Sequence, residues 1–260
     1  MSLSVPKYRL FQPCEQLQPF IKAFAIQGTI DERIYQVLPD TALVIGFQYQ
    51  GSLSWMCENE EIVLTPFGIT GILDNMRRFK NTGNTGSILI FFKDGGAAAF
   101  FDQPLHEISG QSLSLECLIS IFELKIIQEQ LQEARTDAVR ISVIEKFLIT
   151  KMHTAKPDEL ITTAIRLIRA SEGSIRIDQL CKQLHTSKSP LEKRFRKIAG
   201  TSPKKFASLV RFRSVLTLNK EHLTMTEMAY RAGYYDQAHF INQFKAYTGD
   251  SPEKFFAGGV

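Results

Sequence analysis

Phe195-Arg-Lys-Ile-Ala-Gly-Thr-Ser-Pro-Lys-Lys-Phe206 aligns without a gap with Phe244-Lys-Ala-Tyr-Thr-Gly-Asp-Ser-Pro-Glu-Lys-Phe255. The Phe, Gly, Ser, Pro, Lys and Phe positions coincide in the two stretches. Self-similarity at a fixed offset indicates a duplicated supersecondary unit. In each copy a glycine, Gly200 or Gly249, is suited to end a helix in the left-handed conformation, and the Ser-Pro pair is suited to begin the next helix.

Each copy is preceded by a pattern of helix, short turn and helix. The first unit is expected to comprise helices 177–184 and 188–199, with His185-Thr186 as the turn and Ser187 as N-cap. The second is expected to comprise helices 227–232 and 237–247, with Thr226 and Asp236 as N-caps. One long helix, from Pro203 to about Lys220, joins the two units. Residues 157–260 are therefore predicted to form an all-α domain of two helix-turn-helix units.

A helix-turn-helix unit inserts the N-terminal part of its second helix into the DNA major groove. The outward side chains there are expected to contact base edges, and they are Lys188, Ser189, Glu192, Lys193, Gln237, Ala238, Ile241 and Asn242. A second set of cations is expected to neutralise phosphates: Arg196, Lys204, Lys205, Arg211, Arg213 and Lys245.

The distribution of charge agrees with a nucleic-acid partner for this half. Residues 1–156 hold 14 Lys and Arg against 17 Asp and Glu, a net charge of −3, whereas residues 157–260 hold 17 against 10, a net charge of +7. A basic domain behind a mildly acidic one indicates that the second half contacts a polyanion.

The pattern Ala229-x-x-x-Gly233-Tyr-x-Asp-x-Ala-His-Phe-x-x-x-Phe244-Lys-x-x-x-Gly249-x-Ser-Pro-x-x-Phe255 resembles the signature of the AraC/XylS family of transcription regulators, over roughly residues 160–257. The resemblance implies two helix-turn-helix units on one face of a double-stranded DNA operator, contact with RNA polymerase, and a role as activator. His185 stands where the family frequently has a turn glycine, and Ser189-Pro190 is unusual at the start of a recognition helix. The motif positions with a structural role are Phe195, Gly200, Pro203, Gly233, Asp236, His239, Phe240, Phe244, Gly249 and Pro252.

Residues 1–110 have the short alternating apolar runs and Gly/Pro punctuation of an antiparallel β-barrel or sandwich. The whole chain is thus predicted to be α+β with two domains. Val37-Leu-Pro-Asp40 and Phe91-Phe92-x-x-Gly95-Gly-Ala-Ala-Ala-Phe100 resemble the sensor domains of some regulators of this family, which implies a small-molecule effector but does not identify it. Arg77-Arg78 is interpreted as a solvated loop pair rather than an anion site, and the aromatic residues that could line a pocket are Trp55, Phe67, Phe79, Phe91 and Phe92.

Residues 111–156 are expected to be a helical extension and linker. A helical pattern begins near Leu113, and a second segment runs over 138–152. These helices could form a homodimer seam or pack on the sheet, and the pattern favours packing. Residues 153–158 are the expected linker, because Pro157 stops one helix and Asp158 can cap the next.

The sequence lacks the motifs of other function classes. The sequence has no GxSxG, P-loop or GxGxxG and no His-x-His, so we expect no enzyme, cofactor or metal site. No apolar run approaches the length of a membrane span, and a cytoplasmic protein with reduced, buried cysteines (Cys14, Cys57, Cys117 and Cys181) is expected. Two alternatives stay open: a helical interaction module that does not bind DNA, and a DNA-repair methyl-acceptor protein fused to this domain.

Overall fold

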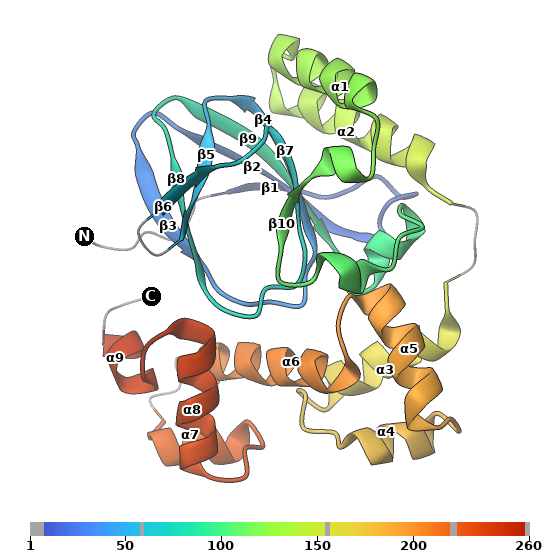
Figure 1. Ribbon diagram of the computed structural model, residues 1–260, viewed down its shortest axis with the longest axis vertical. Coiled ribbons are helices and arrows are strands. Elements are labelled where there is room, and N and C mark those ends of the chain that lie inside the picture. The colour runs from blue at the N-terminus through green and yellow to red at the C-terminus, as the bar shows by residue number, and fades with distance from the viewer. Residues whose placement is uncertain (1–7, 58–59, 154–156, 219–222, 258–260) are drawn as a thin grey trace.

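The computed structural model describes residues 8–57, 60–153, 157–218 and 223–257. Its N-terminal part consists of two antiparallel sheets that face each other (Figure 1). In spatial order the first sheet contains β1 (Arg9–Phe11), β2 (Ile21–Thr29), β9 (Thr85–Phe92), β4 (Val44–Gln50), β7 (Phe67–Thr70) and β10 (Ser112–Ser114). The second contains β3 (Arg33–Val37), β8 (Arg77–Asn81), β5 (Leu53–Cys57) and β6 (Glu60–Val63). The arrangement is a sandwich, one of the two predicted architectures.

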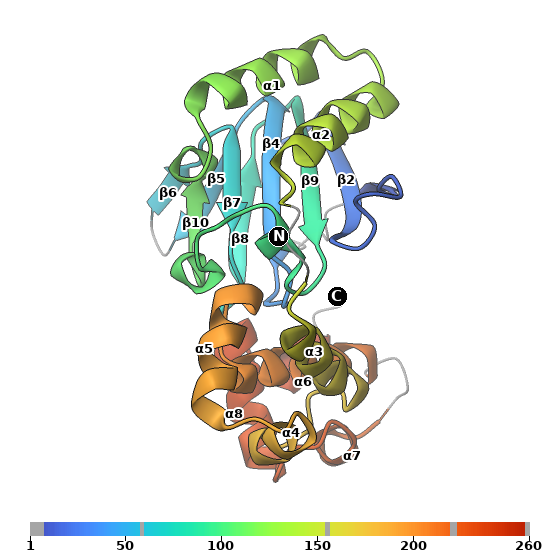
Figure 2. The same cartoon turned by 90° about the vertical axis from the view of Figure 1, so that its right-hand side faces the viewer.

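Two helices cover the outer face of the first sheet, α1 (Ile121–Glu133) and α2 (Asp137–Lys151) (Figure 2). Alternate residues of the central strands, such as Phe47 and Ile88, point outward and join Leu124 and Phe147 of the helices in one buried cluster. The Phe47 and Phe147 rings lie edge to face with centroids 6.0 Å apart. The favoured interpretation of these helices, packing on the sheet, is confirmed.

The residues that alternate with these core positions point between the two sheets. Several of them are small, including Gly46, Gly68 and Ser87. Because a strand points successive side chains to opposite faces, the large side chains of these strands fill the outer core, and the space between the sheets is not filled. Two short 3-10 helices, η1 (Gly96–Ala99) and η2 (Leu105–Ile108), lie at the end of the sandwich that faces the helical part.

The C-terminal part is all α: α3 (Glu159–Ala170), α4 (Ile177–Gln183), α5 (Lys188–Ala199), α6 (Pro203–Leu218), α7 (Met225–Arg231), α8 (Gln237–Thr248) and α9 (Pro252–Ala257). Helix α6 contributes to two separate cores. Phe206 and Val210 pack with α3, α4 and α5, whereas Leu209 and Phe212 pack with α7 and α8. The two predicted helix-turn-helix units therefore share one connecting helix.

Local capping signals are confirmed at most of the predicted helix ends. Gly200 and Gly249 end α5 and α8 in the left-handed conformation, with φ of 79° and 82°. The Asp236 carboxylate accepts a hydrogen bond from the His239 backbone N at 2.7 Å. His185, which stands where the family frequently has glycine, adopts a φ of 48°, so it supplies the left-handed turn without a glycine.

Several expectations differ from the structure. Leu113 lies in β10, which pairs with β7, so the helical pattern begins at Ile121 rather than at Leu113. Helix α7 is capped by Thr224, which with Glu227 forms a capping box, and not by Thr226. Of the four cysteines expected to be buried, Cys181 is buried, whereas Cys14 and Cys57 are half-buried and Cys117 is exposed. Residues 154–156 of the expected linker and Lys220 at the expected end of the long helix lie outside the described residues.

Candidate nucleic-acid interface and ligand cavity

The two helices predicted to contact DNA, α5 and α8, meet the sandwich with their C-terminal ends. Gly95 of the sandwich lies against Ile198 near the end of α5, and the Tyr247 carbonyl of α8 accepts a hydrogen bond from Met76 N at 2.9 Å. A helix rises 1.5 Å per residue. The N-terminal turns of both helices therefore lie about 15 Å further from the sandwich, at the opposite end of the helical domain (Figure 1).

Most of the predicted base-reading side chains are exposed on these N-terminal turns, namely Lys188, Ser189, Lys193, Gln237, Ala238 and Asn242, while Glu192 and Ile241 are half-buried. Each helix is anchored by fully buried aromatic residues on its other face, Phe195 in α5 and Phe240 with Phe244 in α8. Glu192 pairs with Arg196 one turn further along, at 2.8 Å.

The predicted phosphate contacts fall into two groups. Arg196, Lys204 and Lys245 are exposed. Lys205 and Arg213 lie instead on the side of α6 that faces the sandwich, where they pair with Asp74 (3.0 Å) and Asp40 (3.4 Å). Arg211 is half-buried, donates to the Gly173 carbonyl at 2.8 Å and lies over the Tyr234 ring. The sequence does not indicate which face of α6 the sandwich covers, so the ion pairs of Lys205 and Arg213 with the sandwich were not expected.

Further contacts join the two parts of the chain. The Arg169 guanidinium of α3 donates to both carboxylate oxygens of Asp94, at 2.7 and 2.9 Å, and also to Thr41. Ile72 of the sandwich is 3% exposed and belongs to the core formed by α6, α7 and α8. The packing of Ile72 in this core holds the two domains in a fixed relative position. Three ion pairs across the domain boundary do the same: Arg169–Asp94, Lys205–Asp74 and Arg213–Asp40.

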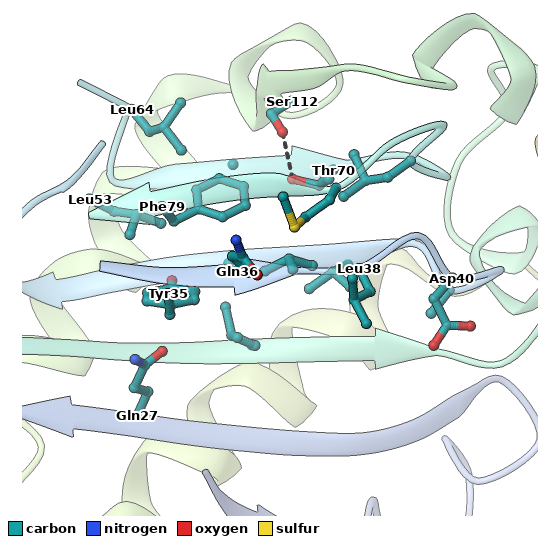
Figure 3. Close-up of a pocket in the computed structure, with 18 of the residues that line it drawn as sticks. Gln27, Tyr35, Gln36, Leu38, Asp40, Leu53, Leu64, Thr70, Phe79 and Ser112 are labelled. Atoms are coloured by element: carbon teal, nitrogen blue, oxygen red, sulfur yellow. Dashed lines mark hydrogen bonds between the residues drawn. The ribbon is translucent and has the colours of Figure 1, made fainter. Parts of the chain in front are cut away.

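A cavity of about 1170 Å³ lies between the two sheets (Figure 3). Its wall includes apolar residues from both sheets, such as Val44, Leu89 and Phe91 on one side and Leu53 and Phe79 on the other. Its mouth is bordered by Arg213, Leu216 and Phe255 of the helical domain. Of the aromatic residues singled out from the sequence, Phe79 and Phe91 line the cavity, whereas Phe67 and Phe92 belong to the outer core and Trp55 lies beneath Arg77.

Polar side chains line the end of the cavity that lies away from the mouth. Gln27, Ser87 and Gln48 lie side by side on β2, β9 and β4, because Ser87 pairs in register with both glutamines, and Asn81 comes from the second sheet. We call these four residues the amide cluster. Gln48 is 8% exposed and Asn81 1% exposed, yet Gln48 Nε2 and both amide atoms of Asn81 have no hydrogen-bond partner among the described residues. None of these four residues was predicted from the sequence to be a site residue.

Arg77 is buried rather than solvated on a loop. It lies in β8, donates to Ser112 Oγ at 2.8 Å and to the Gly110 carbonyl, and its guanidinium lies 4.4 Å from the centre of the Trp55 ring. Burial lowers the pKa of Arg77 from its usual value, and nearby Cys57 and Asp74 oppose that effect. Arg77 does not line the cavity itself, but Ser112, which accepts its hydrogen bond, does.

In the part of the chain that the structure describes, no cluster of three or more His, Cys, Asp or Glu side chains could hold a metal ion. Within the same residues, no helix is both long enough and apolar enough to cross a bilayer.

A sandwich with an internal cavity, joined to two helix-turn-helix units on one connecting helix, is the two-domain organisation predicted from the sequence for a transcription regulator. The family model "Helix-turn-helix domain" matches residues 180–258, and "Domain of unknown function (DUF6597)" matches residues 9–114. The Msm operon regulatory protein of Streptococcus mutans is 29% identical over 136 residues, which cover 51% of this chain and 49% of that protein. The chain thus spans about half the length of this curated relative. Together with the signature at residues 229–255, these matches support the resemblance of the chain to the AraC/XylS family of transcription regulators.

Solved structures of ToxT from Vibrio cholerae are also similar to this chain. A 1.65 Å structure of ToxT has 12% identity and a TM-score of 0.47, and the match covers 90% of this chain and 97% of that one. A ToxT structure described as bound to an unsaturated fatty acid has 13% identity and a TM-score of 0.44, with 89% and 93% covered.

Proposed function

We propose that this regulator binds a DNA operator in a sequence-specific manner through both helix-turn-helix units, under the control of a small molecule bound in the sandwich cavity. The observation that carries the proposal is the exposure of the N-terminal turns of α5 and α8 at the end of the helical domain away from the sandwich. A duplex could approach both turns without displacing the sandwich.

The proposal also covers the direction of regulation, the partner proteins and the location of the protein. We infer that the protein acts in the cytoplasm, as an activator that contacts RNA polymerase. Phe122 and Ile126 are 77% and 54% exposed one turn apart on α1, and they offer a surface for a homodimer. The cavity mouth is bordered by Arg213, which pairs with Asp40 across the domain boundary, so a bound effector would contact the link between the domains.

The experiment that tests DNA binding is selection from a random-sequence duplex library by the purified chain at physiological salt. We expect two enriched blocks about 10 base pairs apart, because adjacent major grooves on one DNA face repeat at that spacing. Binding without enrichment would contradict sequence-specific recognition. Failure to bind even at low salt would favour an interaction module that does not bind DNA, and a fast-reacting thiol at neutral pH would favour the methyl-acceptor alternative.

Base-reading and phosphate-binding residues are expected to respond differently to substitution. Gln237→Ala and Asn242→Ala should each relax the preference at one or two base pairs, at a cost of about 1–3 kcal/mol of discrimination. Lys245→Ala should weaken binding to every sequence and lower the slope of log affinity against log salt by about one. Titration of matched and mismatched duplexes at several salt concentrations measures both effects. Uniform losses in all three variants would exclude the assignment of α8 to the major groove.

Ile72→Asp is expected to separate the two domains. A carboxylate at this position would be desolvated among Leu209 and Phe212 without a partner, at a cost of several kcal/mol that undocking avoids. Small-angle X-ray scattering should show a larger radius of gyration, while the selected DNA motif is kept. The control is Ile30→Asp, which introduces the same charge at a side chain that is 83% exposed. Equal compactness of the two variants would show that Ile72 does not hold the domains together.

A further inference from the structure

Among the described residues that line the cavity, those with buried side-chain polar atoms that lack a hydrogen-bond partner, Gln48 and Asn81, both belong to the amide cluster. Its four members, Gln27, Gln48, Asn81 and Ser87, are all neutral and all carry hydrogen-bonding groups. Buried polar atoms in folded proteins nearly always have a partner, and each one that lacks a partner costs about 1–3 kcal/mol. Gln48 Nε2, Asn81 Nδ2 and Asn81 Oδ1 are three such atoms close to one lumen. They present both donors and an acceptor.

The charged residues of the cavity lie at the other end. Asp40 and Arg213 pair with each other at 3.4 Å at the mouth, Lys254 pairs with Asp250, and Lys22 is exposed. Val44, which pairs with Phe91 near the mouth, precedes Gln48 by four residues on β4. The amide cluster is therefore about 13 Å further along the sandwich.

The two tyrosines that line the cavity are also uncharged at neutral pH. Burial raises the pKa of Tyr8 to about 12, and it raises the pKa of Tyr35 further. Between the amide cluster and the mouth the wall combines apolar side chains and glycines, such as Leu89, Phe79 and Gly46, with the uncharged polar side chains of Gln36, Thr70 and Ser112, of which the last two hydrogen-bond to each other at 3.0 Å. A charged group carried to the amide cluster would lose its hydration and gain no counter-ion from the lining residues, which disfavours ions there.

We propose that the ligand of this cavity is an uncharged amphipathic molecule whose polar end, bearing both a hydrogen-bond donor and an acceptor, binds the amide cluster while its apolar body extends to the mouth. Primary amides and hydroxyl compounds have this chemistry. This inference depends on the proposed function in one respect, because it takes the sandwich cavity to be the effector site.

The test compares three probes that share a ten-carbon chain: decanamide, decanoate and decylammonium. Calorimetric titration of the full chain at pH 7 should give a Kd for decanamide about tenfold or more below those for the two ions, as two or three recovered hydrogen bonds would supply. Gln48→Leu and Asn81→Leu should each remove this preference. The matched control is Gln50→Leu, the same change two residues along β4 at an exposed side chain that does not line the cavity, and it should keep the preference.

Thermal melting of the unliganded variants gives a second measurement. Because these amide atoms have no protein partner, Gln48→Leu and Asn81→Leu should leave Tm unchanged or raise it. A lower Tm in both variants would instead assign the amides a role in folding and overturn the proposal. A preference for decanoate, which would point to Arg77 behind Ser112, would overturn it as well. So would a preference for decylammonium, the absence of binding by all three probes, or a decanamide preference that survives in both leucine variants.

DNA selection with the same preparations separates this proposal from the proposed function. An enriched two-block motif with no decanamide preference would contradict only the ligand class. A clear decanamide preference without any DNA binding would contradict only the proposed function.

Discussion

Phe244→Ala is expected to remove one of the two blocks of the selected DNA motif and leave the other in place. The Phe244 side chain is fully buried, and its ring centroid lies 5.3–5.8 Å from those of Phe212, Phe240, Phe255 and Phe256. Truncation of a buried phenylalanine to alanine costs about 3–5 kcal/mol. This is a large part of the stability of a typical domain, so α8 should lose its fixed position against α6 and α7.

Phe195→Ala provides the reciprocal experiment. Phe195 is buried in the other core, against Phe206 at 5.4 Å, and α6 separates this core from that of the second unit. This variant should lose the other block and keep the one that depends on α8. Phe244→Leu, which retains most of the apolar volume, should keep both blocks with a smaller loss of stability. Loss of both blocks in each alanine variant would show that the two units do not fold or bind separately.

The helical domain could be predicted almost entirely from the sequence because its signals are local. Glycine caps, Ser-Pro helix starts and buried aromatic residues at helical spacing each act within one or two turns, and their repetition at residues 195–206 and 244–255 reinforced the pattern. The one misplaced cap shows the limit of such signals. Thr224 and Thr226 are both suitable caps, and the Glu227 side chain selects Thr224 because it reaches back to the Thr224 backbone N at 2.8 Å.

The sandwich was predictable as a class but not in its detail. Strand pairing depends on residues far apart in sequence, such as Gln48 beside Ser87, and no local pattern reports that register. Gln48 itself carried a usable signal. In Val44-Ile-Gly-Phe-Gln48 the alternation puts Ile45 and Phe47 on one face, so a glutamine on the other face, with Val44 and Gly46, indicates a polar lumen. Arg77 lacked even that signal, because its partners Trp55, Ser112 and Gly110 come from separate segments.

The contacts between the domains were beyond sequence analysis. Asp94 and Arg169 are 75 positions apart and fall in different domains, and an ion pair at this separation leaves no local pattern. The same contacts account for the phosphate residues that the structure placed differently. Lys205 and Arg213 resemble any exposed cations of a basic helix until the sandwich, with Asp74 and Asp40, is positioned beside them.

Gly173→Ala is expected to destabilise the helical domain by about 2–5 kcal/mol. Gly173 follows α3 with a φ of 78°, and a Cβ there would lie 2.1 Å from the Ala207 carbonyl oxygen and 2.8 Å from Arg211 N, both backbone atoms of α6. Left-handed backbone costs an alanine about 1–2 kcal/mol, and overpacking adds about 1–3 kcal/mol. Because α6 cannot yield without disturbing both cores, the turn between α3 and α4 should move away and lose the hydrogen bond from Arg211 to the Gly173 carbonyl.

Gly249→Ala is the matched control for crowding. Gly249 has a φ of 82°, nearly that of Gly173, but a Cβ at this position would meet nothing within 4 Å. Only the backbone strain remains, so the expected cost is about 1–2 kcal/mol. Urea unfolding of the two variants beside the parent chain, followed by circular dichroism, measures the difference. Equal losses would mean that the contact of Gly173 with α6 relaxes freely. A clearly larger loss in Gly173→Ala would mean that this close approach positions the first helix-turn-helix unit on the helix that it shares with the second.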